Sequence, residues 1–309
     1  MRIAIVGLGI QGKKRKAIAA EDVVACVDVI APGADYKTVE QVPLSAYDAA
    51  LVCTPDKAKL EMLQYLLSHG KHVLVEKPLL SEDEKQLREL YELSRSMRVA
   101  CYTAYNHRFE PHLTRLKETL SSGILGKIYL VRAFYGNGTA MDVKNSIWRD
   151  QGIGVLSDLG SHLLDTMLFL FGEIDSDFEV WSYDSFENSA CDHVLFGSRG
   201  KFVLEMEATL LSWRNTFTLD VFGEMGSAHI NCLCKWGPST LTIRTRIFPS
   251  GRPHEEVQTI ESQDPTWALE YRYFKDLCLT GGSNLESDIW INATLNRLAR
   301  AMGKGVLQG

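Results

Sequence analysis

The sequence predicts an α/β protein in two parts: an abridged, doubly wound parallel sheet over residues 1–106, and an α+β domain over residues 107–309 with an open, mostly antiparallel sheet. Two observations lead to this fold class. Up to Tyr105, short apolar runs alternate with amphipathic helical segments, as in a parallel sheet covered by helices. Beyond Tyr105, strands of alternating apolar and polar residues indicate an antiparallel sheet with one exposed face.

The composition is that of a soluble enzyme. The chain has 309 residues, enough for two domains, and 45% of them are hydrophobic. Its net charge is −6 with both signs dispersed, which argues against a nucleic-acid or anionic-membrane partner. The most apolar segment, residues 163–171, is too short to span a bilayer, and the chain begins with a strand rather than a signal peptide.

The cysteines indicate a reducing compartment. There are seven, an odd number, and they form no C-x-x-C pair. Cys232 and Cys234 are two residues apart, which would place them on one face of a strand, but no histidine is spaced to complete a zinc site. We therefore expect reduced thiols, a cytoplasmic protein and no metal.

An N-terminal apolar strand enters the sequence Gly7-Leu8-Gly9-Ile10-Gln11-Gly12, and a helix follows. In such a turn Gly7 permits the tight bend, Gly9 lets the backbone approach a diphosphate, and Gly12 allows close packing of helix on strand. The diphosphate would lie at the helix N-terminus, where free N–H groups favour anions. The pattern predicts a Rossmann domain that binds a dinucleotide.

A second apolar run, residues 23–27, ends at Asp28. Because it lies about twenty residues beyond the first glycine, this carboxylate is expected to accept hydrogen bonds from the adenosine ribose. Val29 and Ile30 follow and could not receive a 2′-phosphate, so the sequence favours NAD over NADP. The basic cluster at residues 13–16 could meet that phosphate, but we interpret it as a solvated helix face.

The remaining elements of the first domain are a strand over residues 47–55, a helix over residues 56–69, a helix over residues 82–96 and a strand over residues 99–103. Gly70 ends the first of these helices, and the hydroxyl of Ser81 is expected to cap the second. The segment from Asp28 to Thr54 is too short for the usual helix and additional strand. We therefore expect the sheet to be abridged on that side.

Glu76-Lys77-Pro78 is the most informative tripeptide in the chain. It follows the apolar run at residues 72–75, so Lys77 stands at the carboxyl end of a buried parallel strand. Open α/β sheets bind their ligands at that edge. The proline disfavours a helical conformation at Lys77, which ends the strand there. Alone, the tripeptide favours the alternative of an ordinary strand end with a solvated lysine, and the glycine turn at the start of the chain changes that interpretation.

In the second domain, strand-like alternation appears over residues 128–134, 178–183, 190–196, 202–211, 217–222 and 241–248. One helix, residues 156–165, interrupts these strands and carries Asp158 and His162. These residues are four apart and therefore share a helix face. A histidine beside a carboxylate suits general acid–base chemistry. Alternatively, Asp158 belongs to the helix start and His162 to the core.

Together these sequences resemble the Gfo/Idh/MocA family of nicotinamide-dependent oxidoreductases. The resemblance covers nearly the whole chain and rests on the glycine turn and on residues 48–55, 70–78, 105–111, 154–162 and 221–227. It implies that Lys77 hydrogen-bonds the reacting hydroxyl beside the nicotinamide while His162 takes or returns its proton. Asp158 would orient His162 or hold a second hydroxyl.

The resemblance also implies NAD as the cofactor and a set of contacts for each ligand. The expected cofactor contacts are Gly7, Gly9, Ile10, Gln11, Gly12, Asp28, Thr54, Pro55, Glu76 and Lys77. The expected substrate contacts are Lys77, Asn106, Arg108, Arg149, Asp158 and His162. For Asn106 and Arg108, an equal alternative is that they form a loop cap or a structural ion pair. For Arg149 and Trp148, the alternative to a substrate contact is plain packing. Lys59 stands where many members of the family have a histidine.

The family implies a carbohydrate substrate without fixing which one. This chain looks similar to the branch that oxidises the 3-hydroxyl of UDP-N-acetylglucosamine or its uronic acid, and a dehydrogenase of inositol or a free sugar is the nearest alternative. Two alternatives come from other classes: an NAD-dependent glycosidase and a regulator that senses a dinucleotide. The half-apolar sheet of the second domain predicts a homodimer or homotetramer.

Overall fold

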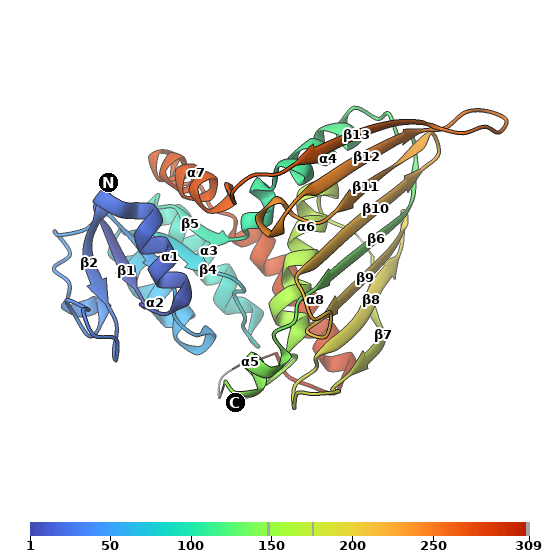
Figure 1. Ribbon diagram of the computed structural model, residues 1–309. Helices are drawn as coiled ribbons and strands as arrows, with labels where there is room; N and C mark the ends of the chain where they lie inside the picture. The colour runs from blue at the N-terminus through green and yellow to red at the C-terminus, as the bar shows by residue number, and fades with distance from the viewer. Residues whose placement is uncertain (147–148, 175, 307–309) are drawn as a thin grey trace. The chain divides into compact units, whose positions relative to one another are not determined.

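The computed structural model describes residues 1–146, 149–174 and 176–306 (Figure 1). Trp148, for which we expected packing or a substrate contact, lies outside the described residues. The chain forms two compact units, one of Met1–Asn106 with Trp267–Asn292 and one of His107–Thr266 with Ala293–Gly309. We expected residues 107–309 to form the second domain; the compact units differ from that division at residues 267–292, which group with the first unit.

The first unit is built on a parallel sheet of five strands, as predicted. In chain order the strands are β1 (Ile3–Val6), β2 (Val23–Val27), β3 (Ala49–Val52), β4 (His72–Glu76) and β5 (Cys101–Ala104). They lie in the order β2-β1-β3-β4-β5 and pair in parallel throughout. Between β2 and β3 the described chain forms only a short 3₁₀ turn, Val39–Gln41, so the expected abridgement is confirmed.

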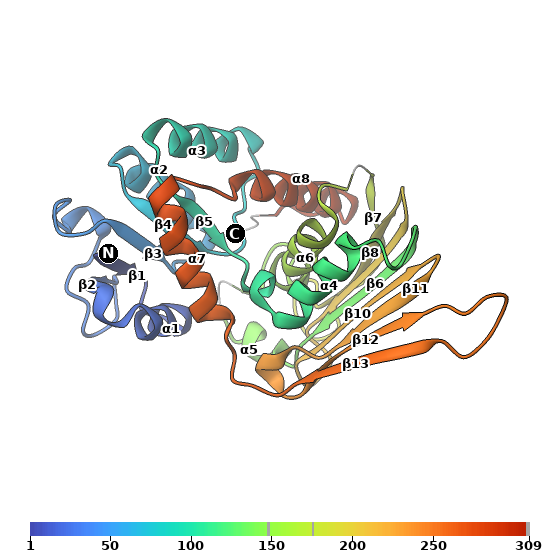
Figure 2. The same cartoon turned by 90° about the horizontal axis from the view of Figure 1, so that it is seen from above.

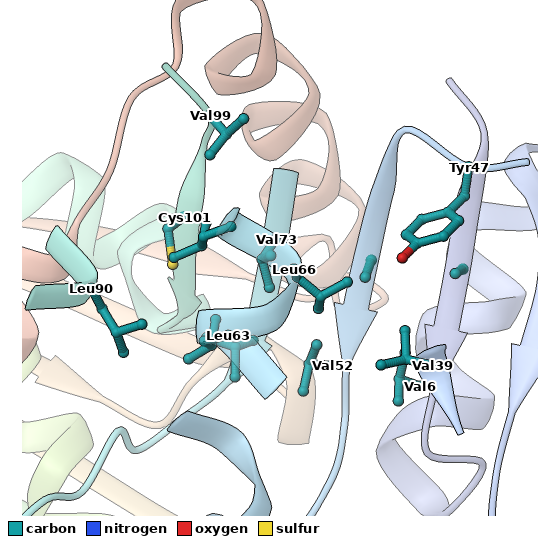
Figure 3. Packing of buried hydrophobic residues seen from close by; sticks show 14 of the residues in the cluster. Val6, Val39, Tyr47, Val52, Leu63, Leu66, Val73, Leu90, Val99 and Cys101 are labelled. Carbon is teal, nitrogen blue, oxygen red and sulfur yellow. The ribbon is translucent and has the colours of Figure 1, made fainter. Parts of the chain in front are cut away.

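Helices cover both faces of this sheet (Figure 2). Helices α2 (Asp56–Ser68) and α3 (Glu84–Met97) lie on one face, and α1 (Ile10–Ala19) and α7 (Thr266–Thr280) lie on the other. On the α2 side, Leu63 and Leu66 pack against Val52 and Val73, and all four are fully buried (Figure 3). Continuous apolar strands such as these require helices on both sides.

Helix α3 begins two residues later than expected, because Asp83 rather than Ser81 is its N-terminal cap. The Asp83 carboxylate accepts a hydrogen bond of 3.0 Å from the Lys85 amide. The Ser81 hydroxyl accepts one of 3.1 Å from the Asp83 amide and therefore supports the cap from one step away.

Arg15 explains why α7 belongs to the first unit. We expected residues 13–16 to form a solvated face, but the Arg15 side chain is 1% exposed and forms ion pairs with Glu76 of β4 at 2.8 Å and Glu270 of α7 at 2.7 Å. Its guanidinium also lies 4.2 Å from the ring centroid of Trp267. A buried cation requires such compensation, so α7 folds back onto α1.

The second unit contains the predicted open sheet, with eight strands that are antiparallel except for the β6–β9 pair. The sheet order is β13-β12-β11-β10-β6-β9-β8-β7. The strands are β6 (Ile128–Gly136), β7 (Phe178–Asp184), β8 (His193–Arg199), β9 (Val203–Thr209), β10 (Thr216–Gly223), β11 (Gly226–Asn231), β12 (Ser239–Thr245) and β13 (His254–Ile260).

The sequence did not predict β11 or β13. Strand β13 lies at the edge of the sheet and is mostly exposed, so its residues show no apolar alternation. The expectation that Cys232 and Cys234 share a strand face is wrong. Cys232 follows β11 with a φ of 67°, and Cys234 starts a 3₁₀ turn, Cys234–Trp236.

Several helices accompany this sheet. Helix α4 (Pro111–Ser121) and helix α6 (Ser161–Phe171) lie on one of its faces, and α5 (Ala140–Lys144) is a single short turn. The helix expected over residues 156–165 is composite, because a π-helical segment, Leu156–Gly160, precedes α6. Helix α8 (Leu285–Ala301) contributes its residues up to Asn292 to the first unit and the rest to the second. Among the helices in the described parts of the chain, we find none with the length and hydropathy of a membrane span.

We predict that Arg15→Met lowers the free energy of unfolding by about 3–5 kcal/mol, because it leaves two carboxylates buried without their cation. Urea denaturation measures the change. Arg115→Met is the control, since the Arg115–Glu118 pair is exposed and should contribute less than about 1 kcal/mol. Equal losses in the two variants would contradict the importance of the buried pair.

Candidate active site

The glycine turn has the geometry that a diphosphate site requires. Gly7 has a φ of 92°, and a Cβ there would lie 2.6 Å from the carbonyl oxygen of Cys53. A Cβ on Gly12 would lie 1.7 Å from the carbonyl oxygen of Gly7, so α1 can approach β1 only with glycine at that position. At Gly9, in contrast, a Cβ would meet nothing within 4 Å. That open space lies beside the exposed residues Ile10 and Gln11 of the first helical turn.

Asp28 follows β2, and its carboxylate organises the backbone around it. It accepts hydrogen bonds from the amides of Leu8 at 2.7 Å, Ile30 at 2.8 Å and Ala31 at 2.8 Å. These bonds, led by those from Ala31 and Leu8, hold the pKa of Asp28 below its usual value. The carboxylate therefore ties the glycine turn to the end of β2 and remains ionised where the ribose would bind.

Thr54 and Pro55 follow β3 at the same edge of the sheet. The Thr54 hydroxyl oxygen is buried, and no group in the described parts of the chain hydrogen-bonds it. Pro55 is the N-terminal cap residue of α2. A buried hydroxyl without a partner beside the glycine turn and Asp28 is what a bound dinucleotide would satisfy, so the residues present fit NAD.

The carboxyl end of β4 carries Glu76 and Lys77. Glu76 was expected to contact the cofactor, but its carboxylate accepts a hydrogen bond of 2.8 Å from Arg15 and so helps to hold α1 in place. Lys77 follows the strand directly and is joined to Pro78 by a cis peptide bond. Beneath this segment lies the buried ammonium group of Lys59, which donates hydrogen bonds to the carbonyl oxygens of Lys77 and Pro78.

In the second unit, His162 belongs to a cluster of rings. Its side chain is 8% exposed, and its ring stacks on that of His107 with 4.3 Å between the centroids. The ring centroid of Tyr135, on β6, lies 5.8 Å from that of His162 and 5.7 Å from that of Trp236. The ammonium group of Lys235 approaches Nε2 of His107 to 3.3 Å. The cluster therefore brings a candidate acid–base residue together with a second imidazole and a cation.

Sequence analysis did not assign His107, Tyr135, Lys235 or Trp236 to this site. His107 lies within the expected segment 105–111 and was available as a signal. Tyr135 is one of several apolar residues on the buried side of β6, and Lys235 follows a strand that was itself not predicted. No pattern in the sequence distinguishes these residues from ordinary core and loop residues.

Asp158 lies in the π-helical segment before α6, and its carboxylate accepts a hydrogen bond of 3.3 Å from Arg149. Burial raises the pKa of Tyr135, and the charge of Asp158 raises it further. Asp158 therefore lies near the ring cluster, which brings Arg149, Asp158 and His162 into one region of the second unit. The wider π turn departs from the α-helical spacing on which their shared face was predicted.

Asn106 and Arg108 occupy the segment after β5. Arg108 forms the structural ion pair that the sequence left as an alternative, with Nε 3.0 Å from both carboxylate oxygens of Asp165 and Nη2 2.5 Å from one of them. Burial raises the pKa of Asp165, while the Arg108 charge opposes that shift. Asn106 is 7% exposed and opens the 3₁₀ turn Asn106–Phe109. Its contact with a substrate stays a prediction.

Among the described residues, no group of three or more histidine, cysteine, aspartate or glutamate side chains could hold a metal ion.

Comparison with protein families identifies both parts of the chain. Residues 1–105 match the model of an oxidoreductase family with an NAD-binding Rossmann fold, and residues 113–229 match the GFO/IDH/MocA C-terminal domain. The chain belongs to the Gfo/Idh/MocA family. The expected NAD-binding Rossmann domain is thereby confirmed for residues 1–105 of this Gfo/Idh/MocA protein.

Three relatives illustrate its place in the family. The rhizopine catabolism protein MocA of Rhizobium meliloti is 28% identical over 193 residues, 58% of this chain and 60% of MocA. Levoglucosan dehydrogenase in complex with NADH has a TM-score of 0.85 at 18% identity, with complete coverage of both chains. UDP-N-acetylglucosamine 3-dehydrogenase of Acidithiobacillus ferrooxidans has a TM-score of 0.78 at 17% identity, with 97% coverage of both chains.

These comparisons differ in what they establish. The matched part of this chain spans between 35% and 60% of the length of three curated relatives, one of which is MocA. The two solved structures share less than a fifth of their residues with it, and they establish the fold.

We predict that Asp28→Asn weakens NADH binding about 10- to 100-fold, the effect of losing hydrogen bonds to a charged group worth ~1.5–3 kcal/mol. Fluorescence titration with NADH measures it. Because the pKa of Asp28 is depressed, the carboxylate stays ionised well below neutrality, and the wild-type affinity should be flat from about pH 8 to pH 5.

Asp35→Asn is the matched control. Asp35 also accepts a backbone hydrogen bond, of 2.8 Å from the amide of Cys26, but it is exposed and does not bond the glycine turn. An equal loss of NADH affinity in this variant would show that Asp28 acts only through the stability of the loop.

Proposed function

We propose that this protein is an NAD-dependent dehydrogenase that oxidises a secondary hydroxyl of a sugar by hydride transfer. The observation that carries the proposal is the position of Lys77. It directly follows β4 at the edge of the sheet where the glycine turn, Asp28 and Thr54 also lie. Ligands of open α/β sheets bind at that edge.

A specific group supplies each part of the proposed chemistry. Bound NAD supplies the hydride acceptor. The Lys77 ammonium group hydrogen-bonds the reacting hydroxyl and stabilises its oxygen as negative charge develops. His162 takes the hydroxyl proton in oxidation and returns it in reduction. Asp158 and Arg149, joined by their hydrogen bond, orient further hydroxyls of the sugar.

The first substrate to test is a nucleotide-linked sugar, UDP-N-acetylglucosamine oxidised at C3. The shared fold of the UDP-N-acetylglucosamine 3-dehydrogenase supports this choice, and the levoglucosan dehydrogenase, which has the higher TM-score, makes a free sugar or inositol the competing choice. The assay follows nicotinamide absorbance with UDP-hexosamines, myo-inositol and free hexoses. Each reaction is repeated with a 2-oxo acid, which would reoxidise tightly held NADH. Turnover with none of these substrates would contradict the proposal.

We propose NAD rather than NADP as the partner of Asp28, because its carboxylate would repel a 2′-phosphate. Lys37 favours the phosphate, since its ammonium group donates a hydrogen bond of 3.1 Å to the Val29 carbonyl and its charge contributes to the lowered pKa of Asp28. Parallel titrations with NADH and NADPH decide between the two cofactors.

We also propose a cytoplasmic homodimer or homotetramer. The face of the eight-stranded sheet opposite the buried side chains carries ion pairs between neighbouring strands, Arg132 with Glu205 and Arg244 with Glu255. The same face carries the partly exposed apolar side chains of Leu130, Phe134 and Phe222, and a half-apolar face of this kind supports association of copies of the chain. Light scattering during size-exclusion chromatography would contradict the proposal with a mass equal to one chain.

We predict that Lys77→Ala and His162→Asn each reduce turnover about 10²- to 10⁴-fold, the range expected for loss of a positioned acid–base group. The NADH dissociation constant should stay within a few-fold in both. His229→Asn is the control, because His229 also pairs with a carboxylate, Asp220 at 2.6 Å, but lies on the outer side of β11. Full activity in Lys77→Ala would contradict the proposed role of Lys77, whereas wild-type protein that binds NADH but turns over no substrate would favour a dinucleotide sensor.

A further inference from the structure

Lys59 is a buried cation that none of the proposed chemistry uses. It lies in the first turn of α2, and its side chain is 3% exposed. Its ammonium group donates to Asp56 Oδ1 at 2.7 Å, to the Lys77 carbonyl oxygen at 3.2 Å and to the Pro78 carbonyl oxygen at 2.9 Å. An ammonium group has three N–H donors, and these three acceptors account for all of them.

We infer that Lys59 is a positioning residue that holds Lys77 in place at the cofactor edge of the sheet. The inference rests on the proposed role of Lys77. Lys59 touches the backbone of Lys77 rather than its side chain, so it acts by fixing where the chain leaves β4. Its two carbonyl partners are consecutive, since that of Lys77 belongs to the peptide bond to Pro78 and that of Pro78 to the next one.

The topology gives this contact its effect. Strands β3 and β4 are neighbours in the sheet, and α2 starts immediately after the segment that follows β3. Lys59 therefore links the loop that carries Thr54 to the loop that carries Lys77. Loop backbone lacks the hydrogen-bond partners of a strand, so these two carbonyls would otherwise need water or another donor.

The contact supplies hydrogen-bond donors to two backbone carbonyl oxygens at a buried place. Carbonyl oxygens that lose their partner in a buried place are unfavourable, and the segment would relax to find new donors. A shift of about 1 Å in a group that contacts a reacting atom is enough to cost about 100-fold in rate. The expected consequence of losing Lys59 is therefore a fall in kcat, with ligand binding little changed.

The test compares Lys59→Met with a matched control, Lys71→Met. Methionine keeps most of the apolar stem and removes the N–H donors. Lys71 also donates to two backbone carbonyls, those of Leu44 at 2.6 Å and Tyr47 at 2.8 Å, but it precedes β4 and so lies at the other end of the strand from Lys77. The measurements are kcat, KM, the NADH dissociation constant and hydrogen exchange by mass spectrometry.

We expect Lys59→Met to lower kcat about 10- to 100-fold while KM and the NADH dissociation constant stay within about threefold. Lys59→Arg, which keeps a cation with several N–H donors, should recover part of kcat. Lys71→Met should leave kcat unchanged and speed hydrogen exchange around residues 44–47. Unchanged kcat in Lys59→Met, or equal losses in the two methionine variants, would overturn the inference.

Failure of the proposed function is distinguishable from failure of this inference. If the wild-type protein turns over no sugar, the proposed function is wrong, and if Lys77→Ala keeps full activity, the proposed role of Lys77 is wrong. Hydrogen exchange then decides the role of Lys59 by itself. Faster exchange around residues 76–81 in Lys59→Met, but not in Lys71→Met, supports the inference that Lys59 positions this segment. Unchanged exchange there overturns it.

Discussion

The first unit depends on the buried charge of Arg15. Burial opposes that charge, and the carboxylates of Glu270 and Glu76 outweigh burial and raise the pKa of Arg15. The three groups come from α7, β4 and α1, which are far apart in the chain. Because the guanidinium cannot be buried without both carboxylates, the helix after the glycine turn, the strand before Lys77 and a helix from the C-terminal third must assemble together.

Beyond the carboxyl ends of the strands in the first unit, charged side chains hold the loop backbone in place. Asp28 accepts hydrogen bonds from three amides, and Lys59 donates hydrogen bonds to two carbonyls, so opposite charges satisfy opposite backbone groups. β5 is the last strand at one side of the sheet. There the Asn284 side chain accepts a hydrogen bond from the Thr103 amide and donates one to the Thr103 carbonyl, so it takes the place of a neighbouring strand. Loops at a binding edge need such partners, because no neighbouring strand supplies them.

The sequence predicted what periodicity and local chemistry determine. The parallel strands, the glycine turn, the shortened segment before β3 and Lys77 after β4 all follow from short patterns. It failed where a distant partner decides the outcome. The sequence around Arg15 predicts a solvated residue, because nothing local shows that Glu270 lies beside it. Strand β13 has no apolar alternation because it is an exposed edge strand. His107 and Lys235 meet only through the fold of the second unit, so spacing could not join them.

The same contrast explains why the cofactor is easier to assign than the substrate. The dinucleotide site is made largely of backbone, and a glycine at a φ of 92° or at a 1.7 Å approach leaves a signature in the sequence. The second unit instead presents side chains from turns, such as His107, Lys235 and Trp236, in a fold shared with the levoglucosan and UDP-N-acetylglucosamine dehydrogenases. Side chains of this kind can change without altering the fold, so the fold alone does not specify a substrate.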